Sequence, residues 1–367
     1  MKIAKLFCAL LSAAMLSVCC SSSSKLSPRD SLRVAYGDYF PIGVALGAHT
    51  YAPSRADSLI RRHFNTITAE NCMKPLHIGR QEGEYNFEQA DQMIAYAQEN
   101  GMSVRGHALV WYQSAPEWFF ADAPDGSPVT RELAYERLRE YIHAVVSHFK
   151  GRVYCWDVVN EAISDKAGEY LREDDNWHKL CGGEFIEKAF IYAHEADPDA
   201  LLFYNEYGIT YPEKRDNTIR LIKDLQSKGV PIHGIGMQSH WNIEHPTREA
   251  LVETIEEFRK LNLIIHSTEL DVRMNAHWAG GELTAQDHEY AVYEYTPELE
   301  ERQSEQYRMI FETFREYKDD IRSVTFWNLC DSQTWLDVRK GNLGRHFPLL
   351  FDDDMAPKKC YYAAVEF

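Results

Sequence analysis

Hydrophobic and polar positions along the chain form short apolar runs that alternate with longer amphipathic segments. The apolar runs are rich in β-branched and aromatic residues and stop at polar side chains, which is typical of buried parallel strands. They fall at residues 42–46, 66–70, 103–110, 153–159, 201–205, 234–238, 264–269 and 323–327. The longer segments repeat apolar residues every three or four positions and so predict helices, including residues 131–149, 185–195, 217–228, 248–260 and 297–317.

These predicted strands and helices alternate from about residue 40 to the end of the chain, which is the order of repeated βα units around a parallel sheet. Strands and helices in this order predict the α/β class and a single (β/α)8 TIM barrel. The length of 367 residues fits one barrel of this kind. We therefore predict one folded domain over residues 36–367.

The first 35 residues are predicted to lie outside this domain. Lys2 and Lys5 precede an apolar run at residues 6–18, and cysteines and serines follow it, which is the plan of a bacterial export signal at residues 1–20. Residues 21–35 are then a short polar tether. The apolar run is too short to span a bilayer as a stable anchor, so contact with a membrane is expected only through a lipid on the chain.

The end of the export signal resembles the site at which bacterial lipoproteins are cleaved and lipidated. Its residues are Leu16, Ser17, Val18 and Cys19, and Cys19 would carry the lipid. Val18 departs from the pattern because a small residue usually precedes the cysteine, so ordinary secretion is the alternative. We expect an outer-membrane or cell-surface lipoprotein, or otherwise a periplasmic or extracellular protein.

Composition narrows the choice of partner. The formal net charge of −17 argues against a nucleic acid or an anionic membrane surface, because like charges repel. A neutral substrate is expected, and aromatic residues, at 13% of the chain, either stack on its rings or fill a large core. No metal or cofactor is predicted, because the cysteines beyond the export signal lack the spacing of a metal site: Cys72, Cys155, Cys181, Cys330 and Cys360.

Acids, amides and aromatic rings gather at the carboxyl ends of the predicted strands, which converge on one face of a (β/α)8 barrel. The strongest local signal is Trp156-Asp157-Val158-Val159-Asn160-Glu161-Ala162, in which an apolar strand ends in an amide and a carboxylate. A second carboxylate ends the seventh strand in Ser267-Thr268-Glu269-Leu270-Asp271. The two carboxylates are therefore expected to meet at the mouth of the barrel.

Four more motifs accompany these two in chain order. They are Glu70-Asn71-Cys72-Met73-Lys74, Gly106-His107-Ala108-Leu109-Val110-Trp111, Gln238-Ser239-His240 and the segment from Trp327 to Trp335. The ordered set resembles glycoside hydrolase family 10, the endo-β-1,4-xylanases, over residues 39–367. The resemblance implies a barrel enzyme that hydrolyses internal β-1,4-xylosidic bonds, with xylan or a xylo-oligosaccharide as its partner.

The resemblance implies that Glu161 is the acid/base and Glu269 the nucleophile of a retaining double displacement. In this reaction one carboxylate attacks the anomeric carbon, while the other protonates the leaving oxygen and then activates water. Such a pair stands about 5 to 5.5 Å apart. The alternative, that both acids form only surface ion pairs, conflicts with the order of the six motifs.

The resemblance also implies a set of substrate contacts, several of which have a purely structural alternative. Asn160 would hold the sugar 2-hydroxyl group, or else cap the next helix. His240, beside Gln238, would hydrogen-bond Glu269, and Lys74 has the alternative of an ordinary surface lysine. Tryptophans that wall the sugar pocket have the alternative of core packing. The full set is Glu70, Asn71, Lys74, His107, Trp111, Asn160, Tyr207, Gln238, His240, Trp327 and Trp335.

Two positions depart from the family pattern: Tyr112 stands where many members have histidine, and Asn328 where glycine commonly follows the tryptophan. Other functions stay open beside the xylanase. A retaining β-1,4-glucanase or mannanase shares the two-acid geometry. A non-catalytic glycan-binding surface lipoprotein conflicts with the intact pair of acids, and a metal-dependent hydrolase would need a His and Asp cluster. A monomer is expected.

Overall fold

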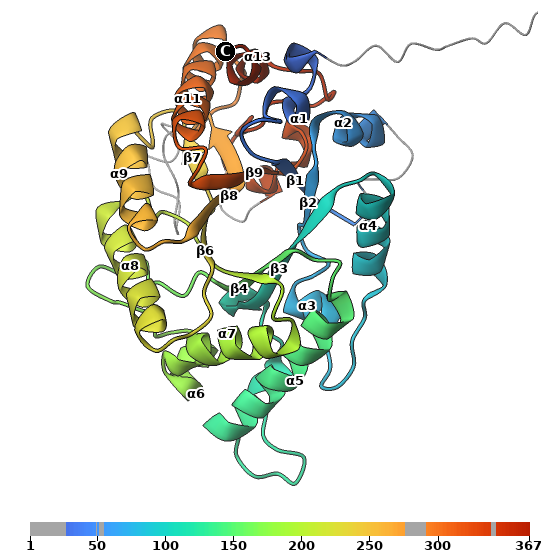
Figure 1. Ribbon diagram of the computed structural model, residues 1–367, viewed down its shortest axis with the longest axis vertical. Helices are drawn as coiled ribbons and strands as arrows, with labels where there is room; N and C mark the ends of the chain where they lie inside the picture. The colour runs from blue at the N-terminus through green and yellow to red at the C-terminus, as the bar shows by residue number, and fades with distance from the viewer. Residues whose placement is uncertain (1–26, 49, 51–54, 276–290, 339–342) are drawn as a thin grey trace, which may run out of the picture.

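The computed structural model describes residues 27–48, 50, 55–275, 291–338 and 343–367. Helices surround a ring of parallel strands, so the chain forms the predicted (β/α)8 barrel (Figure 1). The ring closes because β6 pairs with β8, and β9 pairs with both β8 and β1. The carboxyl ends of the ring strands therefore meet at one face of the barrel, as the sequence predicts.

The strands of the ring match the eight predicted segments to within a few residues at each end. They are β1 (Ile42–Leu46), β2 (Thr66–Ala69), β3 (Ser103–Trp111), β4 (Cys155–Asn160), β5 (Leu201–Glu206), β6 (Gly234–Met237), β8 (Ile264–Arg273) and β9 (Ile321–Trp327). The largest difference is that β8 runs to Arg273 rather than to residue 269. It continues because β7 (His240–Asn242), which the hydrophobic pattern does not predict, pairs with it at Asp271, Val272 and Arg273.

The five predicted helices are confirmed, with one shifted start. The described α-helices are α1 (Leu32–Ala35), α2 (Arg55–His63), α3 (Pro75–Ile78), α4 (Glu88–Glu99), α5 (Arg131–Phe149), α6 (Asn176–Cys181), α7 (Glu184–Ala196), α8 (Pro212–Ser227), α9 (Arg248–Arg259), α11 (Pro297–Glu316), α12 (Trp335–Val338) and α13 (Lys359–Val365). The described 3₁₀ helices are η1 (Pro28–Asp30), η2 (Tyr112–Ser114), η3 (Glu117–Phe120) and η4 (Asp331–Gln333). Helix α8 begins at Pro212 rather than at residue 217, since proline suits the first helical turn. None of the helices described is long and apolar enough to cross a bilayer.

The folded part of the chain begins before the predicted domain boundary at residue 36. The sequence places residues 28–35 in the tether, but they form η1 and α1, and the side chain of Leu32 is fully buried. The Ser31 hydroxyl also donates a hydrogen bond to the carbonyl oxygen of Arg62, 2.5 Å away. Residues 1–26, which hold the predicted export signal, lie outside the described residues.

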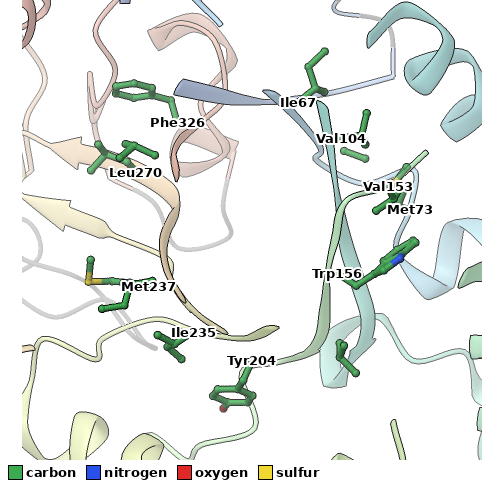
Figure 2. Close-up of a cluster of buried hydrophobic side chains, with 14 of the residues drawn as sticks. Ile67, Met73, Val104, Val153, Trp156, Tyr204, Ile235, Met237, Leu270 and Phe326 are labelled. Carbon is green, nitrogen blue, oxygen red and sulfur yellow. The ribbon is translucent and has the colours of Figure 1, made fainter. Parts of the chain in front are cut away.

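Large apolar side chains fill the layer between the strands and the helices. Ile67, Val104, Trp156 and Phe326 lie outside the ring of strands (Figure 2). Trp156 packs near Phe149 of α5, with their ring centroids 6.0 Å apart. Successive residues of a strand point to opposite faces, so the neighbouring positions project into the barrel.

The interior of the barrel holds a buried ion pair between Arg105 and Asp157. These two residues directly follow Val104 and Trp156, whose side chains point outward. Arg105 donates to Asp157 from Nε at 3.1 Å and to Nδ1 of His266 from Nη1 at 2.8 Å. Burial and the Arg105 charge keep the pKa of His266 well below its usual value, so its neutral ring accepts this bond. Asp157 also contacts His107 Nδ1 at 2.9 Å, which links the barrel interior to the mouth.

Candidate active site

Side chains at the carboxyl ends of the strands line a cavity of about 1030 Å³. Both predicted catalytic glutamates and all eleven predicted substrate contacts line it. The structure therefore brings the predicted residues together, while their individual roles stay predictions. They are Glu70, Asn71, Lys74, His107, Trp111, Asn160, Glu161, Tyr207, Gln238, His240, Glu269, Trp327 and Trp335.

Glu269 lies within β8 and is held by side-chain donors. Its Oε1 accepts a hydrogen bond from Asn205 Nδ2 at 2.7 Å, and its Oε2 lies 3.1 Å from His240 Nε2. Burial alone would raise the pKa of Glu269, but the hydrogen bond from His240 and the electrostatic effects of His107 and His240 outweigh it. The net pKa lies below its usual value, so Glu269 is a carboxylate at neutral pH.

His240 bridges two carboxylates. Its Nδ1 lies 2.7 Å from Asp271 Oδ2, opposite the contact of its Nε2 with Glu269. Burial would lower the pKa of His240, but Asp271 and Glu269 together raise it to about 10. His240 is therefore an imidazolium at neutral pH and donates from both nitrogens. Trp335 Nε1 also donates to Asp271 Oδ2 at 3.0 Å, which fixes the far end of the bridge.

Glu161 follows β4 directly, and two donors hold its carboxylate. Trp111 Nε1 donates to Oε2 at 2.8 Å, and Gln238 Nε2 donates to Oε1 at 2.9 Å. The residue is 8% exposed, so a surface ion pair does not describe its position. Its carboxylate lines the cavity from the strand-four side of the mouth, as predicted.

The backbone at Glu161 adopts a conformation that is uncommon for a residue with a side chain. Its φ is 61°, in the left-handed region. The amide nitrogen of Glu161 donates to the carbonyl oxygen of Asn205 at 3.0 Å. Arg172 Nε donates to the carbonyl oxygen of Glu161 at 3.2 Å. Both the amide and the carbonyl group of Glu161 are therefore hydrogen-bonded in this uncommon conformation.

A chain of amides joins the two glutamates. Asn160 Oδ1 accepts from Asn205 Nδ2 at 2.8 Å and from Gln238 Nε2 at 3.2 Å. Asn205 reaches Glu269 and Gln238 reaches Glu161, so each carboxylate is one amide away from Asn160. This chain fixes the two acids relative to each other, and the separation of about 5 to 5.5 Å stays a prediction.

The structural alternatives for Asn160 and Lys74 do not fit the structure. The next helix, α6, begins at Asn176 and is capped by Asp175, so Asn160 is not its cap. Lys74 is 8% exposed, with its Nζ 4.7 Å from the centre of the Trp111 ring and 3.2 Å from Asn71 Oδ1. Burial lowers the pKa of this ammonium group. Lys74 is therefore a buried amino group in the cavity wall and not an ordinary surface lysine.

The tryptophans line the cavity and also contact the residues that hold the acids. Trp327 lies edge-on to His107, with ring centroids 5.2 Å apart. Trp335 lies 4.9 Å from the His240 ring by the same measure. Because both rings border the cavity, core packing alone does not account for them.

The two residues that depart from the family pattern, Asn328 and Tyr112, both make local contacts in the structure. Asn328 has a φ of 86°, a conformation that glycine adopts without cost and asparagine tolerates better than most residues. Its Oδ1 also accepts from the amide of Trp335 at 3.1 Å, which ties the loop after β9 together. Tyr112 lines the cavity, and its ring centre lies 4.3 Å from the Arg172 guanidinium carbon.

Two contacts of the glutamates were not assigned to the site by sequence reasoning. Asn205 ends its predicted strand, and this position was the available signal for a role in the site. A Cβ atom on Gly236 would lie 2.1 Å from Asn205 Oδ1, so this glycine leaves room for the amide. Arg172 lies in the loop between β4 and α6, where no periodic pattern marks it.

Comparisons with known proteins agree with this geometry. The model of the family described as glycosyl hydrolase family 10 matches residues 31–367. An endo-1,4-beta-xylanase of Geobacillus stearothermophilus is 42% identical over 335 residues, which cover 91% of this chain and 98% of the relative. A beta-1,4-xylanase of Dictyoglomus thermophilum is 42% identical over 341 residues, which cover 92% and 91% of the two chains.

A solved structure gives the same result. The crystal structure of an endo-1,4-beta-xylanase from Caldicellulosiruptor owensensis superposes with a TM-score of 0.85 at 39% sequence identity, covering 92% of this chain and 100% of that one. The family match spans most of the chain, and each relative aligns over nearly its full length. The chain belongs to glycosyl hydrolase family 10.

Proposed function

We propose that the protein is an endo-1,4-β-xylanase that hydrolyses internal xylosidic bonds with retention of anomeric configuration. The observation that carries the proposal is that Glu161 and Glu269 line one cavity and are connected by hydrogen bonds through side-chain amides. The names of the relatives support xylan as the substrate. Retention follows from the family resemblance together with a buried carboxylate in the place of the nucleophile.

In the first step, a carboxylate oxygen of Glu269 attacks the anomeric carbon. The bond from that carbon to the bridging oxygen breaks, and the carboxylic acid of Glu161 gives its proton to the leaving oxygen. Glu269 suits attack because His240 keeps it ionised. The product of this step is a glycosyl ester on Glu269 and a released chain end.

In the second step, Glu161 takes a proton from water, and the water oxygen attacks the anomeric carbon. The ester bond breaks, and Glu269 leaves as a carboxylate that His240 again stabilises. Two inversions at one carbon give net retention. Glu161 regains its proton in the same step, so the enzyme returns to its starting state.

The remaining cavity residues would bind the sugar rings around the reacting bond. Asn160, next to the acid/base, would hold the 2-hydroxyl group, a contact that strengthens in the transition state. Polar groups on the side of β2 and β3 would bind hydroxyls of the retained chain: Glu70, Asn71, Lys74 and His107. Trp111, Trp327 and Trp335 would wall the sugar pocket, and Tyr207 would contact the leaving side.

The test compares initial rates on xylan, carboxymethylcellulose and mannan, followed by analysis of the products. We expect internal cleavage of xylan and a β-configured first product by NMR. A preference for cellulose or mannan would replace the xylanase by a glucanase or mannanase. Binding of xylan without any release of sugar would instead support a non-catalytic glycan-binding protein.

We also propose that the protein is a monomer that is exported and anchored by a lipid on Cys19. The sequence of the export signal supports the export and the lipid anchor. The test is labelling of the expressing bacteria with radioactive palmitate, with a Cys19→Ala variant as control. Label on the wild type alone supports the anchor. Unlabelled protein in the medium would indicate ordinary secretion instead.

A further inference from the structure

The cavity extends past the catalytic pair over the loops that follow β4 and β5. Ser164, Asp165 and Lys166 line it from the first loop, and Tyr207, Gly208 and Tyr211 from the second. The two loops are joined, since Arg172 Nη2 donates to the Tyr207 hydroxyl at 3.1 Å. Glu161 begins the first loop and would protonate the leaving oxygen, so the leaving part of the xylan chain would run across this region.

Tyr211 is the exposed aromatic residue of this region. It is 53% exposed although it lines the cavity. A tight turn places it beyond Tyr207, because its amide donates to the carbonyl oxygen of Gly208 at 3.0 Å. An aromatic ring at the edge of a cavity offers a flat apolar surface that a ligand can cover.

One face of the Tyr211 ring stacks on His245, which also lines the cavity. The two ring centroids lie 4.1 Å apart with only 3° between the ring planes. His245 is fixed in turn, since its Nε2 lies 2.8 Å from Thr210 Oγ1 and its amide donates to Asn242 Oδ1 at 2.9 Å. Burial and Arg273 lower the pKa of His245, so the imidazole in this stack is neutral at neutral pH. Because the Tyr211 ring is already held in place, a ligand that stacks on its other face would cost little side-chain conformational entropy.

Polar groups on the first turns of α8 complete the surroundings. Glu213, Lys214 and Asn217 line the same cavity, at positions that follow Tyr211 along the helix. Xylose has C–H bonds on both faces of its ring and hydroxyls around its edge. A flat apolar ring next to carboxylate, ammonium and amide groups matches both parts of that sugar.

We infer that Tyr211, backed by His245, is the stacking platform for a xylose unit on the leaving side of the scissile bond, beyond the unit next to Tyr207. The inference rests on the proposed function, because it needs a leaving chain of several xylose units. It makes Tyr211 a determinant of the preference for long chains over short ones.

The experiment compares two substrates in Tyr211→Ala, Tyr211→Phe and wild-type enzyme. Xylohexaose can place several units on the leaving side, whereas 4-nitrophenyl β-xylobioside places only nitrophenol there. Tyr211→Ala should lower the ratio of kcat/KM for the long substrate to that for the short one by roughly fivefold, through KM. Tyr211→Phe keeps the ring and should hold the ratio within about twofold.

Cleavage position gives a second readout. In Tyr211→Ala, xylohexaose labelled at its reducing end should be cut nearer that end, because the leaving side binds less chain. Tyr293→Ala is the matched control, since Tyr293 is 64% exposed and is not among the described residues that line the cavity. An equal loss on both substrates, or an unchanged ratio and cleavage position, would overturn the inference. Failure of the wild type to cut xylohexaose would instead contradict the proposed function.

Discussion

The two glutamates of the site are held in different ways. Glu269 stands inside strand β8, and its carboxylate is fixed by the side chains of His240 and Asn205. Glu161 stands just after a strand on a left-handed backbone, and the peptide groups around it are bound by other parts of the molecule. Trp111 and Gln238 also donate to the Glu161 carboxylate, but both of these donors are neutral, whereas His240 is an imidazolium. The charged donor keeps Glu269 ionised, and the bound backbone sets the position of Glu161.

This difference matches the two proposed roles. A nucleophile needs to be ionised throughout the working pH range, and an imidazolium donor ensures that. An acid/base gains and loses a proton in each cycle, so permanent stabilisation of one charge state would slow one of its two steps. After Glu161, the amides of Ala162 and Ile163 are both held by the Tyr204 hydroxyl, at 2.9 and 3.1 Å.

The largest expected effect comes from Glu269→Ala. Loss of the nucleophile should lower kcat on every substrate by roughly 10⁵-fold, including aryl xylosides with good leaving groups. The measurement is kcat on xylan and on 2,4-dinitrophenyl β-xylobioside, with circular dichroism to confirm the fold. Near-normal cleavage of either substrate would assign the nucleophile elsewhere.

Glu161→Ala should separate the substrates. Loss of the acid should lower kcat/KM on xylan by roughly 10³-fold, because a sugar oxygen leaves slowly without a proton. Dinitrophenolate needs no proton, so the first step on 2,4-dinitrophenyl β-xylobioside should be spared. A pre-steady-state burst of dinitrophenol measures that step directly. Equal losses on both substrates would remove Glu161 from its role as acid.

His240→Asn should change the pH profile. His240 helps to hold the pKa of Glu269 below its usual value, so Glu269 is ionised above that pKa and its reactivity is lost as the pH falls through it. Without the imidazolium the pKa of Glu269 rises, and the acidic limb of kcat/KM should move to higher pH. We expect a loss of roughly 10- to 100-fold at the optimum.

The control for this change is His143→Asn, because His143 is paired with Glu195 on the protein surface. This control should keep the wild-type profile. A His240→Asn enzyme with an unmoved acidic limb would show that the charge of Glu269 does not depend on His240.

Arg172→Ala should have the smallest of these effects. It removes the hydrogen bonds to the carbonyl oxygens of Glu161 and Ile163, each of which contributes about 1 kcal/mol. We expect a roughly fivefold lower kcat/KM on xylan and a smaller loss on 2,4-dinitrophenyl β-xylobioside. The change displaces the proton donor and also removes the hydrogen bond to Tyr207 on the leaving side, and the aryl substrate depends less on both. Arg139→Ala, which removes a surface ion pair with Glu195, should leave both rates unchanged. Equal losses on both substrates from Arg172→Ala would indicate a general loss of structure.

Much of the fold follows from hydrophobic periodicity, because buried parallel strands and amphipathic helices each leave a strong pattern. The segments that escaped prediction are short or depend on partners distant in the chain. Strand β7 exists only through its pairing with Asp271–Arg273 of β8, which no local pattern reports. Leu32 lies in a polar stretch, and its burial depends on contacts made far along the chain.

The site residues that the sequence predicts are polar or aromatic side chains that lie at the end of a strand and belong to a recognisable motif. The amide chain could not be read from the sequence, since Asn160, Asn205 and Gln238 come from three different strand ends and meet only in the closed barrel. Tyr211 and His245 are likewise separated by 34 positions in the sequence, but their rings stack directly. Both arrangements depend on how loops and strand ends approach each other in three dimensions.

The left-handed backbone at Glu161 also bears on how this enzyme responds to selection. Glycine adopts that conformation freely, and a residue with a Cβ atom pays about 1 kcal/mol for it. Glu161→Gly should therefore melt at a higher temperature than Glu161→Ala, which differential scanning calorimetry can measure. Among inactive variants at this position, a screen for heat resistance alone would therefore favour glycine over alanine, although neither can turn over xylan efficiently. Thermostable variants of this enzyme therefore need to be selected with catalytic turnover in the same screen.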